Sequence, residues 1–307
     1  MIFTFSEDYE TAFEILAKGR EITDSLQLEL AAISIERYGK EETYIAYGAD
    51  KVYSIDSEPQ ADLVVDCISA LINQYKPEIL LIGGTKLGKE VAPRIAHRLK
   101  VGCVTDCIDF FLEQEQLIVK RFVLGGRFIT TQRFLRKPRI VTVPLRKFEK
   151  KFDKDRKGEI IKTSLQPVEP KVQIVEIKGK TPQELRIEEA DIIVSVGRGL
   201  KKKEDLKLIE SLAKALGGAV GCSRSVAADL KWLPEEHWVG LSGHKVKPKL
   251  YIAIGISGQV QHIAGIRDAR TIVAINKDPN APIFKACDYG IIGDLYEIVP
   301  RLIEILQ

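Results

Sequence analysis

Residues 250–279 read LYIAIGISGQVQHIAGIRDARTIVAINKDP. The segments YIAI and TIVAI are short apolar runs, which are typical of β-strands buried on both faces of a sheet. Between them, residues 255–262 (GISGQVQH) carry two glycines, a serine, two glutamines and a histidine. A loop that only joins two strands does not need so many polar groups, so the stretch indicates parallel strands with a ligand-binding loop between them.

The same alternation of apolar runs and helical patterns extends over most of the chain. It is the succession of βαβ units, so we expect an α/β protein with two domains, each built on a mostly parallel sheet. Strands are expected at residues 2–5, 28–35, 50–55, 78–84, 191–196, 218–221, 251–254, 271–275 and 289–293, and helices at residues 8–26, 60–75, 86–99, 203–216 and 294–306.

From about residue 107 the helical pattern stops. Residues 109–126, 127–134 and 139–144 predict short strands joined by tight turns, a β-hairpin extension on one edge of the first sheet. Residues 146–157 then mix lysine and arginine with acidic residues. This mixture of signs favours a solvated loop or hairpin tip over a nucleic-acid patch.

Three prolines, Pro167, Pro170 and Pro182, mark the segment that follows. Such a stretch is typical of an extended connector between domains. We therefore place a boundary near residue 180, with an N-terminal domain at residues 1–180 and a C-terminal domain at residues 181–307.

The composition argues against several classes of protein. Lysine and arginine number 46 against 43 aspartates and glutamates, which gives no general case for binding nucleic acid or an anionic membrane. No apolar run approaches the ~18 residues that a membrane-spanning helix needs. The first ten residues are acidic, so we expect no signal peptide. Five scattered cysteines fit a reduced, cytoplasmic protein with ordinary thiols, and we expect no metal site.

Polar, glycine-rich segments recur in the second half where strands should end. The carboxyl ends of parallel strands lie along one edge of a sheet, so these segments should converge on one crevice. Their backbone amides, hydroxyls and cations predict a dinucleotide cradle. An NAD-type site is not supported, because no G-x-G-x-x-G opens the domain, and no G-x-S-x-G elbow indicates a catalytic triad. The segments are GRGL, GCSRS, VGLSG, GISGQVQH, INKDP and IIGDL.

Two of these segments carry the strongest candidates. Glycines flank Arg198, which lets backbone approach a ligand closely. Ser257 and Gly258 can form the N-cap and tight turn of a short helix, with Gln261 and His262 about one turn in. A lone histidine is often a satisfied core residue, but the polar residues around His262 favour a ligand role.

A long set of motifs runs from DIIVSVGRGL (191–200) through GLSG, LYIAIGISGQVQH, TIVAINKDPNAPIF and DYGIIGDL to the terminal VPRLIEIL. Together these motifs resemble the electron-transfer flavoprotein alpha subunit. In the first half, LLIGGTKLGKEVAPRIAHRLKVGCVTD (80–106) carries a weaker likeness. The resemblance implies a doubly wound C-terminal domain, deoxyhypusine-synthase-like in fold, that binds one FAD. The N-terminal domain would contact a partner and hold no cofactor.

The resemblance also implies a role for each loop at the FAD. Arg198 would contact the phosphate or ribose end, and Asn276, Asp294 and Leu295 would fix the ribose and adenine. The pyrophosphate and ribitol would be held by Ser257, Gly258, Gln259, Val260, Gln261 and His262.

At the flavin end, Ser223 and Arg224 would lie near the pyrophosphate and the ring, and His262 would reach the ring carbonyl O2. Arg224, Ser242 and His262 would tune the redox potential of the flavin, and no residue is expected to be catalytic. The ring would be lined by Val239, Gly240, Leu241 and Ser242, with the Ser242 hydroxyl near N5.

As to partners, the resemblance implies a heterodimer with an electron-transfer flavoprotein beta subunit that holds AMP or a second FAD. The pair would carry electrons from dehydrogenases to a membrane quinone reductase or another acceptor, in the cytoplasm or peripheral to the membrane through that reductase. Residues 240–243 read GLSG where many members have GQTG. With SGQVQH, this leans toward the branch linked to nitrogen fixation, in which some members bifurcate electrons with NADH, ferredoxin and quinone.

Two other hypotheses stay open. An NAD-dependent enzyme could share the deoxyhypusine-synthase-like fold, but it would need a reactive lysine in a pocket, and no lysine lies in a suitable loop. Alternatively, residues 146–157 could bind acidic partners, which predicts salt-sensitive binding of nucleic acid.

Overall fold

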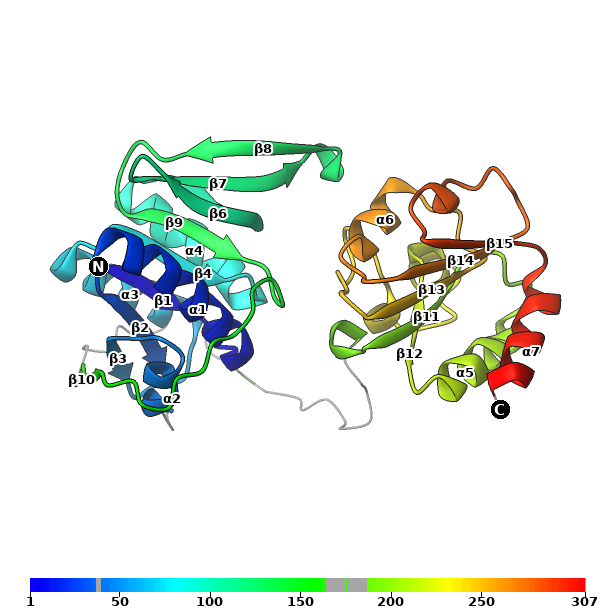
Figure 1. The fold of residues 1–307 in the computed structure, drawn as a ribbon, viewed down its shortest axis with the longest axis horizontal. Coiled ribbons are helices and arrows are strands. Elements are labelled where there is room, and N and C mark those ends of the chain that lie inside the picture. Colours follow the sequence, from blue (N-terminus) through cyan, green and yellow to red (C-terminus); the bar gives the residue numbers. More distant parts are fainter. Residues whose placement is uncertain (37–39, 164–174, 176–186, 307) are drawn as a thin grey trace. The chain divides into compact units, whose positions relative to one another are not determined.

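A computed structural model describes residues 1–36, 40–163, 175 and 187–306 (Figure 1). The chain forms two compact units, Met1–Glu176 and Ile177–Gln307. The predicted boundary between residues 180 and 181 falls outside the described residues, so it stays a prediction. Both units are built on parallel sheets with helices, which confirms the expected two-domain α/β class.

The first unit contains a seven-stranded sheet with the order β10-β3-β2-β1-β4-β9-β5. Every neighbouring pair in this sheet is parallel. Parallel neighbours need crossover connections, which explains why helices separate the first strands along the chain. The strands are β1 (Ile2–Phe5), β2 (Leu30–Ile35), β3 (Lys51–Ile55), β4 (Ile79–Gly83), β5 (Cys103–Val104), β9 (Arg139–Val143) and β10 (Glu159–Lys162).

Helices cover both faces of this sheet. Successive residues of a strand point to opposite faces, so Ile2 packs with α1 and α2, and Phe3 packs with α3 and α4. The Asp8 carboxylate caps α1 by accepting a hydrogen bond from the Thr11 amide at 2.9 Å, and the Thr85 hydroxyl caps α4 in the same way. The helices are α1 (Tyr9–Leu26), α2 (Glu41–Ala46), which the sequence did not predict, α3 (Ala61–Tyr75) and α4 (Lys86–Leu99).

A separate antiparallel sheet of β6 (Cys107–Glu113), β7 (Gln116–Val123) and β8 (Phe128–Arg133) confirms the hairpin extension. The prediction that residues 139–144 belong to this extension is wrong. Residues 139–143 form β9, which lies between β4 and β5 in the parallel sheet. Residues 140–143 are buried. A short apolar run of this kind fits either sheet, so periodicity alone could not place it.

Residues 144–158, which we call the strap, connect β9 to the edge strand β10. In Figure 1 the strap (green) passes α1 and α2 on its way. The Glu14 carboxylate on α1 accepts hydrogen bonds from the amides of Lys147 (2.7 Å) and Phe148 (3.2 Å). The Asp153 amide donates to the carbonyl of Ala46 at 2.8 Å. The strap is therefore attached to both helices through its backbone. It is nevertheless the solvated loop that the sequence predicted, because it contains no helix or strand and residues 149–155 and 157 are exposed.

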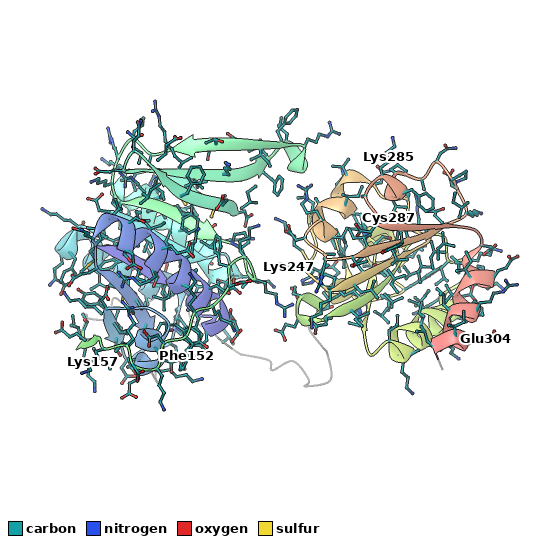
Figure 2. All side chains as sticks on the ribbon, viewed as in Figure 1. Phe152, Lys157, Lys247, Lys285, Cys287 and Glu304 are labelled. Carbon is teal, nitrogen blue, oxygen red and sulfur yellow. The ribbon has the colours of Figure 1, made fainter. Side chains whose placement is uncertain are left out.

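Basic residues of the strap pair with acidic residues of the same unit. Lys150 forms an ion pair with Glu10, and Lys151 forms one with Glu21 at 3.1 Å. Lys157, labelled in Figure 2, is exposed. Because part of the positive charge is neutralised within the unit, the hypothesis of a surface for acidic partners is weakened.

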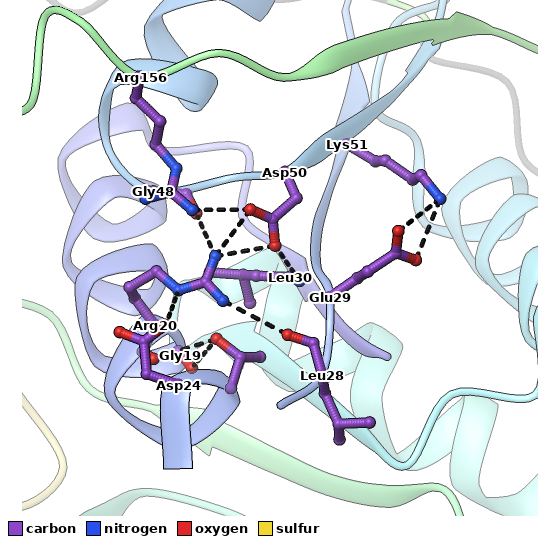
Figure 3. A network of polar contacts seen from close by, with 11 residues as sticks. Gly19, Arg20, Asp24, Leu28, Glu29, Leu30, Gly48, Asp50, Lys51 and Arg156 are labelled. Atoms are coloured by element: carbon purple, nitrogen blue, oxygen red, sulfur yellow. Dashed lines mark hydrogen bonds and ion pairs between the residues drawn. The ribbon is translucent and has the colours of Figure 1, made fainter. Parts of the chain in front are cut away.

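One carboxylate joins four segments of the first unit (Figure 3). Both oxygens of Asp50 accept from Nη1 of Arg20 at 2.8 Å. The same carboxylate accepts from the amide of Leu30 at 2.8 Å and from Nη2 of Arg156 at 2.7 Å. Burial by itself raises the pKa of Asp50, but the hydrogen bonds from Leu30, Arg20 and Arg156 outweigh it, so this pKa lies below its ordinary value.

The second unit contains a five-stranded sheet with the order β12-β11-β13-β14-β15, in which every pair is parallel. Helices α5 and α7 pack on one face and α6 on the other (Figure 1). This confirms the doubly wound domain. The elements are β11 (Ile192–Val196), α5 (Leu206–Ala215), β12 (Ala219–Cys222), β13 (Leu250–Ile254), α6 (Val260–Ile266), β14 (Ile272–Asn276), β15 (Tyr289–Ile292) and α7 (Leu295–Leu306).

Shorter helical turns and free thiols complete the description. All five cysteines are free thiols, buried or half-buried as predicted. Among the described residues, no helix is both long and apolar enough to cross a membrane. The short turns are η1 (Leu124–Gly126), η2 (Ile187–Glu189), η3 (Lys203–Asp205), η4 (Ser225–Asp229), η5 (Glu235–His237) and η6 (Pro282–Lys285).

We expect Asp50→Asn to lower the free energy of unfolding of the first unit by about 2 kcal/mol, because it removes the charge that two guanidinium groups share. The folded-state pKa of Asp50 lies below the unfolded value of about 4. The contribution is therefore present above about pH 4 and is lost as the pH falls through the folded pKa. Urea unfolding of wild type and variant at neutral and acidic pH measures both effects.

Asp24→Asn is the matched control. Asp24 also pairs with Arg20, at 2.8 Å, but its side chain is 67% exposed, so the loss should stay below about 0.5 kcal/mol. If both variants lose the same free energy of unfolding, the contacts of Asp50 with several segments contribute no more than an ordinary surface ion pair.

Candidate functional site

The order of the second sheet reverses between β11 and β13. The chain leaves β11 for β12 on one side and then returns to β13 on the other. In open parallel sheets, ligands bind at the carboxyl ends of the strands where the order reverses in this way. The loops that follow β11 and β13 are residues 197–200 and 255–259, which contain several of the predicted site residues.

These two loops touch through their backbones. The amide of Gly197 donates to the carbonyl of Ile254 at 2.9 Å, and the amide of Gly199 donates to the carbonyl of Gly255 at 3.0 Å. A Cβ on Gly197 would lie 2.3 Å from the carbonyl oxygen of Gly255. A Cβ on Gly199 would lie 2.6 Å from the Cα of Gly255. Both glycines are thus required by the contact with the other loop, whereas their close approach to a ligand stays a prediction. The contact brings Arg198, which is exposed, to the switch point.

The 239–242 loop is tied to α6. The Leu241 amide donates to the carbonyl of Gln261 at 2.7 Å. A Cβ on Gly265 would lie 2.6 Å from the backbone nitrogen of Gly240, so helix and loop approach as closely as their backbones allow. Val239 is buried in the core, whereas Leu241 is 40% exposed. Of this predicted segment, residues 241 and 242 therefore present their side chains to solvent.

The loop after β12 holds the predicted pair Ser223 and Arg224. The Ser223 amide donates to the carbonyl of Val196 at 3.0 Å, and its hydroxyl lies 2.9 Å from that of Ser225. The exposed guanidinium of Arg224 lies 5.7 Å from the ring centroid of Trp238, a cation–π contact. Arg224 is thus held near the start of the 239–242 loop.

The last two strands carry the predicted adenine-end residues. Asn276 donates through Nδ2 to the carbonyl of Ile256 at 2.9 Å, which ties β14 to the loop after β13. Asp294 caps α7, because its Oδ1 accepts from the amide of Tyr296 at 2.9 Å. Leu295 is 6% exposed and packs in the core, so only its backbone lies at the sheet edge.

The prediction that Ser257 caps the helix in GISGQVQH is wrong. Helix α6 begins at Val260, and the N-cap position is taken by Gln259, which makes no side-chain capping bond. Gly258 has φ +82°, and a Cβ there would lie 2.2 Å from the backbone nitrogen of Ile283. The chain therefore turns at Gly258 to pack against η6, which carries Ser257 away from the helix end. The exposed side chains in this segment are those of Ser257, Gln259, Val260 and Gln261.

His262 differs from its neighbours because it is buried, with 7% of its surface exposed. Its Nε2 lies 3.0 Å from the hydroxyl of Tyr251, and its Nδ1 has no hydrogen-bond partner among the described residues. Burial lowers the pKa of His262 to about 4, although the Val239 backbone beside the ring acts in the opposite direction. The imidazole is therefore neutral at pH 7. At that pH the ring can therefore act as a hydrogen-bond donor or acceptor but carries no charge.

Three contributors escaped the sequence reasoning. Tyr251 stands in an apolar run and was counted as core, Trp238 precedes the predicted loop by one residue, and Gly265 lies inside a helix. Each acts through a contact with another segment. A glycine inside a helical pattern was the one signal that could have been read, since it often marks a close approach of backbone.

Metal binding has no support in this geometry. Among the residues that the structure describes, no group of three or more histidine, cysteine, aspartate or glutamate side chains could hold a metal ion.

Comparison with known proteins identifies the family. A model described as the electron transfer flavoprotein domain matches residues 8–168, and one described as the electron transfer flavoprotein FAD-binding domain matches residues 186–267. The electron transfer flavoprotein subunit alpha of Thermoanaerobacterium thermosaccharolyticum is 39% identical over 306 residues, covering 95% of this chain and 92% of that protein. The chain belongs to the electron-transfer flavoprotein alpha-subunit family.

Two other relatives show how widely this family is used. Protein FixB of Clostridium saccharobutylicum is 36% identical over 317 residues, covering 98% of this chain and 95% of that protein. The acryloyl-CoA reductase electron transfer subunit beta of Anaerotignum propionicum is 35% identical over 355 residues, covering 100% and 95%. Membership favours the predicted FAD over the NAD-dependent alternative.

The geometry of this flavoprotein subunit fits FAD. Exposed cations, Arg198 and Arg224, suit a pyrophosphate, and the amides and hydroxyls of the converging loops suit a polar cofactor. The buried Nδ1 of His262, without a partner among the described residues, is a donor or acceptor that a ligand atom could complete. The contacts of individual residues with FAD stay predictions.

We expect Gly255→Ala to destabilise the second unit by about 3 kcal/mol. Gly255 has φ +60°, which costs an alanine about 1 kcal/mol, and a Cβ there would lie 2.8 Å from the Cα of Gly199. Gly217→Ala is the control, because Gly217 has φ +65° but nothing within 4 Å of the added atom. Thermal unfolding of both variants measures the difference. If they lose the same stability, the contact between the two loops is not what requires glycine.

Proposed function

We propose that this chain is the FAD-holding subunit of a heterodimeric electron carrier, which passes electrons from dehydrogenases to a quinone reductase or another acceptor. The observation that carries the proposal is the convergence of loops 197–200, 239–242 and 255–259 at the switch point of an FAD-binding domain. Bound FAD supplies the electron-accepting ring. The chain supplies the phosphate contacts, the orientation of the ring and the donors that set its potential.

In this proposal the phosphate and adenine end lies against the loops after β11, β13, β14 and β15. Arg198 and the exposed amides and hydroxyl of residues 257–259 hold the pyrophosphate. Asn276 and Asp294 are already engaged by the protein, the first on the Ile256 carbonyl and the second on the Tyr296 amide. They would therefore position the ribose and adenine through their remaining lone pairs and the neighbouring backbone.

The flavin end lies between the 239–242 loop and α6. Ser242, exposed on that loop, offers a hydroxyl donor, and Arg224 offers a fixed positive charge beside it. His262 offers a neutral ring nitrogen from the buried side. A hydrogen-bond donor or a positive charge near the flavin ring favours the reduced cofactor, because reduction adds electron density to the ring.

The site suits an electron carrier better than an enzyme with its own nucleophile. Cys222, at the end of β12, is fully buried, and burial raises its pKa to about 12. A thiol in that state is a poor nucleophile at pH 7. The imidazole of His262 faces Tyr251, and among the described residues it forms no hydrogen bond with a serine or cysteine that it could activate.

The proposed partner is an electron-transfer flavoprotein beta subunit carrying AMP or a second FAD, and we place the pair in the cytoplasm. An exposed apolar cluster around the β7–β8 turn supports a protein partner, with Leu124, Phe128 and Ile129 exposed by 73%, 60% and 56%. Such a cluster commonly marks an interaction surface.

Electron bifurcation with NADH, ferredoxin and quinone is the second candidate. It is favoured by residues 240–243, GLSG, together with the SGQVQH segment. The flavin content of the purified heterodimer separates the candidates: two FAD per pair support bifurcation, and one FAD with one AMP supports the simple carrier.

The visible spectrum of the co-expressed heterodimer is the direct test. We expect a flavin spectrum, with one FAD assigned to this subunit. In Arg224→Ala the two-electron flavin potential should fall by roughly 20 mV or more, since removing a nearby positive charge disfavours reduction by about 1 kcal/mol or more. Arg301→Ala, which removes an exposed arginine from α7, is the control. A colourless protein that takes up no FAD would overturn the function, and an unchanged potential would overturn the role of Arg224.

We further expect Phe128→Asp to weaken the heterodimer at least ten-fold, because a charge replaces an exposed ring in the proposed interface. Ile305→Asp, at a residue that is 81% exposed on α7, is the matched control and should leave association unchanged. Size-exclusion chromatography of the co-expressed pair over a dilution series measures both. Full association of the Phe128 variant would place the partner elsewhere.

A further inference from the structure

A short chain of polar groups lies inside the core of the second unit. Among its described residues, Ser195 and His262 are the buried polar side chains, with 0% and 7% exposed, and the fully buried Tyr251 lies beside both. Polar groups in a core cost free energy unless they are hydrogen-bonded, so such a chain calls for a reason.

The sheet and α6 fix these three residues together. Ile193 on β11 is paired with Tyr251 on β13, so Ser195, two residues further along, lies on the same face as the tyrosine. Helix α6 covers that face and brings the imidazole of His262 to a ring-centroid distance of 6.0 Å from the phenol. The Tyr251 hydroxyl and Nε2 of His262 then lie 3.0 Å apart.

The direction of this hydrogen bond follows from counting donors and acceptors. Burial raises the pKa of Tyr251, so its hydroxyl keeps the proton. The nearby Ser195 side chain acts in the opposite direction on the pKa of Tyr251. Its Oγ nevertheless makes no hydrogen bond among the described residues. The phenol proton therefore has one good acceptor, Nε2. In the reverse arrangement both the phenol proton and the Nδ1 lone pair would be left unsatisfied.

With Nε2 accepting, the proton of the neutral imidazole must sit on Nδ1. No group of the described residues forms a hydrogen bond of normal geometry with that atom, although the Val239 backbone lies beside the ring. A buried N–H without an acceptor costs about 1–3 kcal/mol. Val239 begins the 239–242 loop, so this N–H lies next to a segment of the proposed flavin site.

We propose that Tyr251 is a positioning residue, which holds His262 as the neutral Nδ1–H tautomer so that the ring donates to an acceptor atom of the bound flavin. The inference rests on the proposed function for the identity of the acceptor, but not for the tautomer. Without the tyrosine, the imidazole would divide between its two tautomers, and a part of the molecules would turn a lone pair toward the acceptor.

The tautomer is measured first. The chain has four histidines, so ¹⁵N-histidine labelling gives few ring signals, and the spectrum of His262→Gln assigns the one of interest. In the heterodimer, with FAD and after its removal, we expect the nitrogen shifts of a single neutral Nδ1–H ring at pH 7. In Tyr251→Phe they should move toward averaged values. A wild-type ring protonated on Nε2 would overturn the proposal without any variant.

The flavin potential tests the functional part. Tyr251→Phe should lower the potential by at least half of the shift that His262→Gln causes, and it should add no further shift in the His262→Gln background. Tyr53→Phe, which removes a buried tyrosine hydroxyl from the first unit, is the control for loss of stability alone. A shift that persists without His262 would assign Tyr251 a merely structural role. If no FAD binds at all, the proposed function fails, while the tautomer measurement still decides the tyrosine–histidine contact.

Discussion

The backbone of Gly199 lies against the backbone of Gly255, and the convergence of the loops after β11 and β13 depends on that contact. A side chain on either residue would separate the carboxyl ends of β11 and β13, the two strands between which the sheet order reverses. Arg198 and Ser257 would then no longer meet at one edge. Equally close backbone contacts join Gly265 to Gly240 and Gly258 to Ile283. These loops are therefore brought together largely by backbone contacts, and exposed side chains such as Arg198 and Ser242 stay accessible to a ligand.

The first unit has a comparable sheet but uses its polar groups differently. At its own switch point, between β1 and β4, a Cβ on Gly83 would meet the Ser6 hydroxyl at 2.4 Å, and the Thr85 hydroxyl donates to Glu7 at 2.9 Å. The Asp50 carboxylate likewise joins Arg20 of α1, the Leu30 amide of β2 and Arg156 of the strap. Polar groups that are engaged within a unit stabilise it and are not free to bind a ligand. This contrast fits the prediction that the cofactor binds in the second unit, where Arg198 and Arg224 are exposed.

The sequence predicted those features that depend on neighbouring residues and failed where a distant contact decides. Most strands and helices of the two units follow from period and length, although α2, β5 and β10 were not predicted, and the convergence of loops follows from the common direction of parallel strands. Strand β9 was misplaced, because a short apolar run carries no mark of which sheet it joins. Ser257 was misassigned as a helix cap, because the turn at Gly258 is fixed by Ile283. Tyr251 was read as core, because an apolar strand hides the hydroxyl at the tip of a tyrosine.

Two kinds of group set the electrostatics of the site, a buried neutral imidazole and an exposed charged guanidinium. A charge inside the core would cost several kcal/mol, and the protein avoids this cost by keeping His262 neutral, with a pKa of about 4. A fixed positive charge must then come from the surface, where Arg224 keeps its solvation and is held by the ring of Trp238. The two contributions respond differently to the medium. Salt screens the exposed guanidinium, whereas the buried N–H dipole is shielded from it. A potential set mainly by Arg224 would therefore fall as salt is added, and one set mainly by His262 would not change.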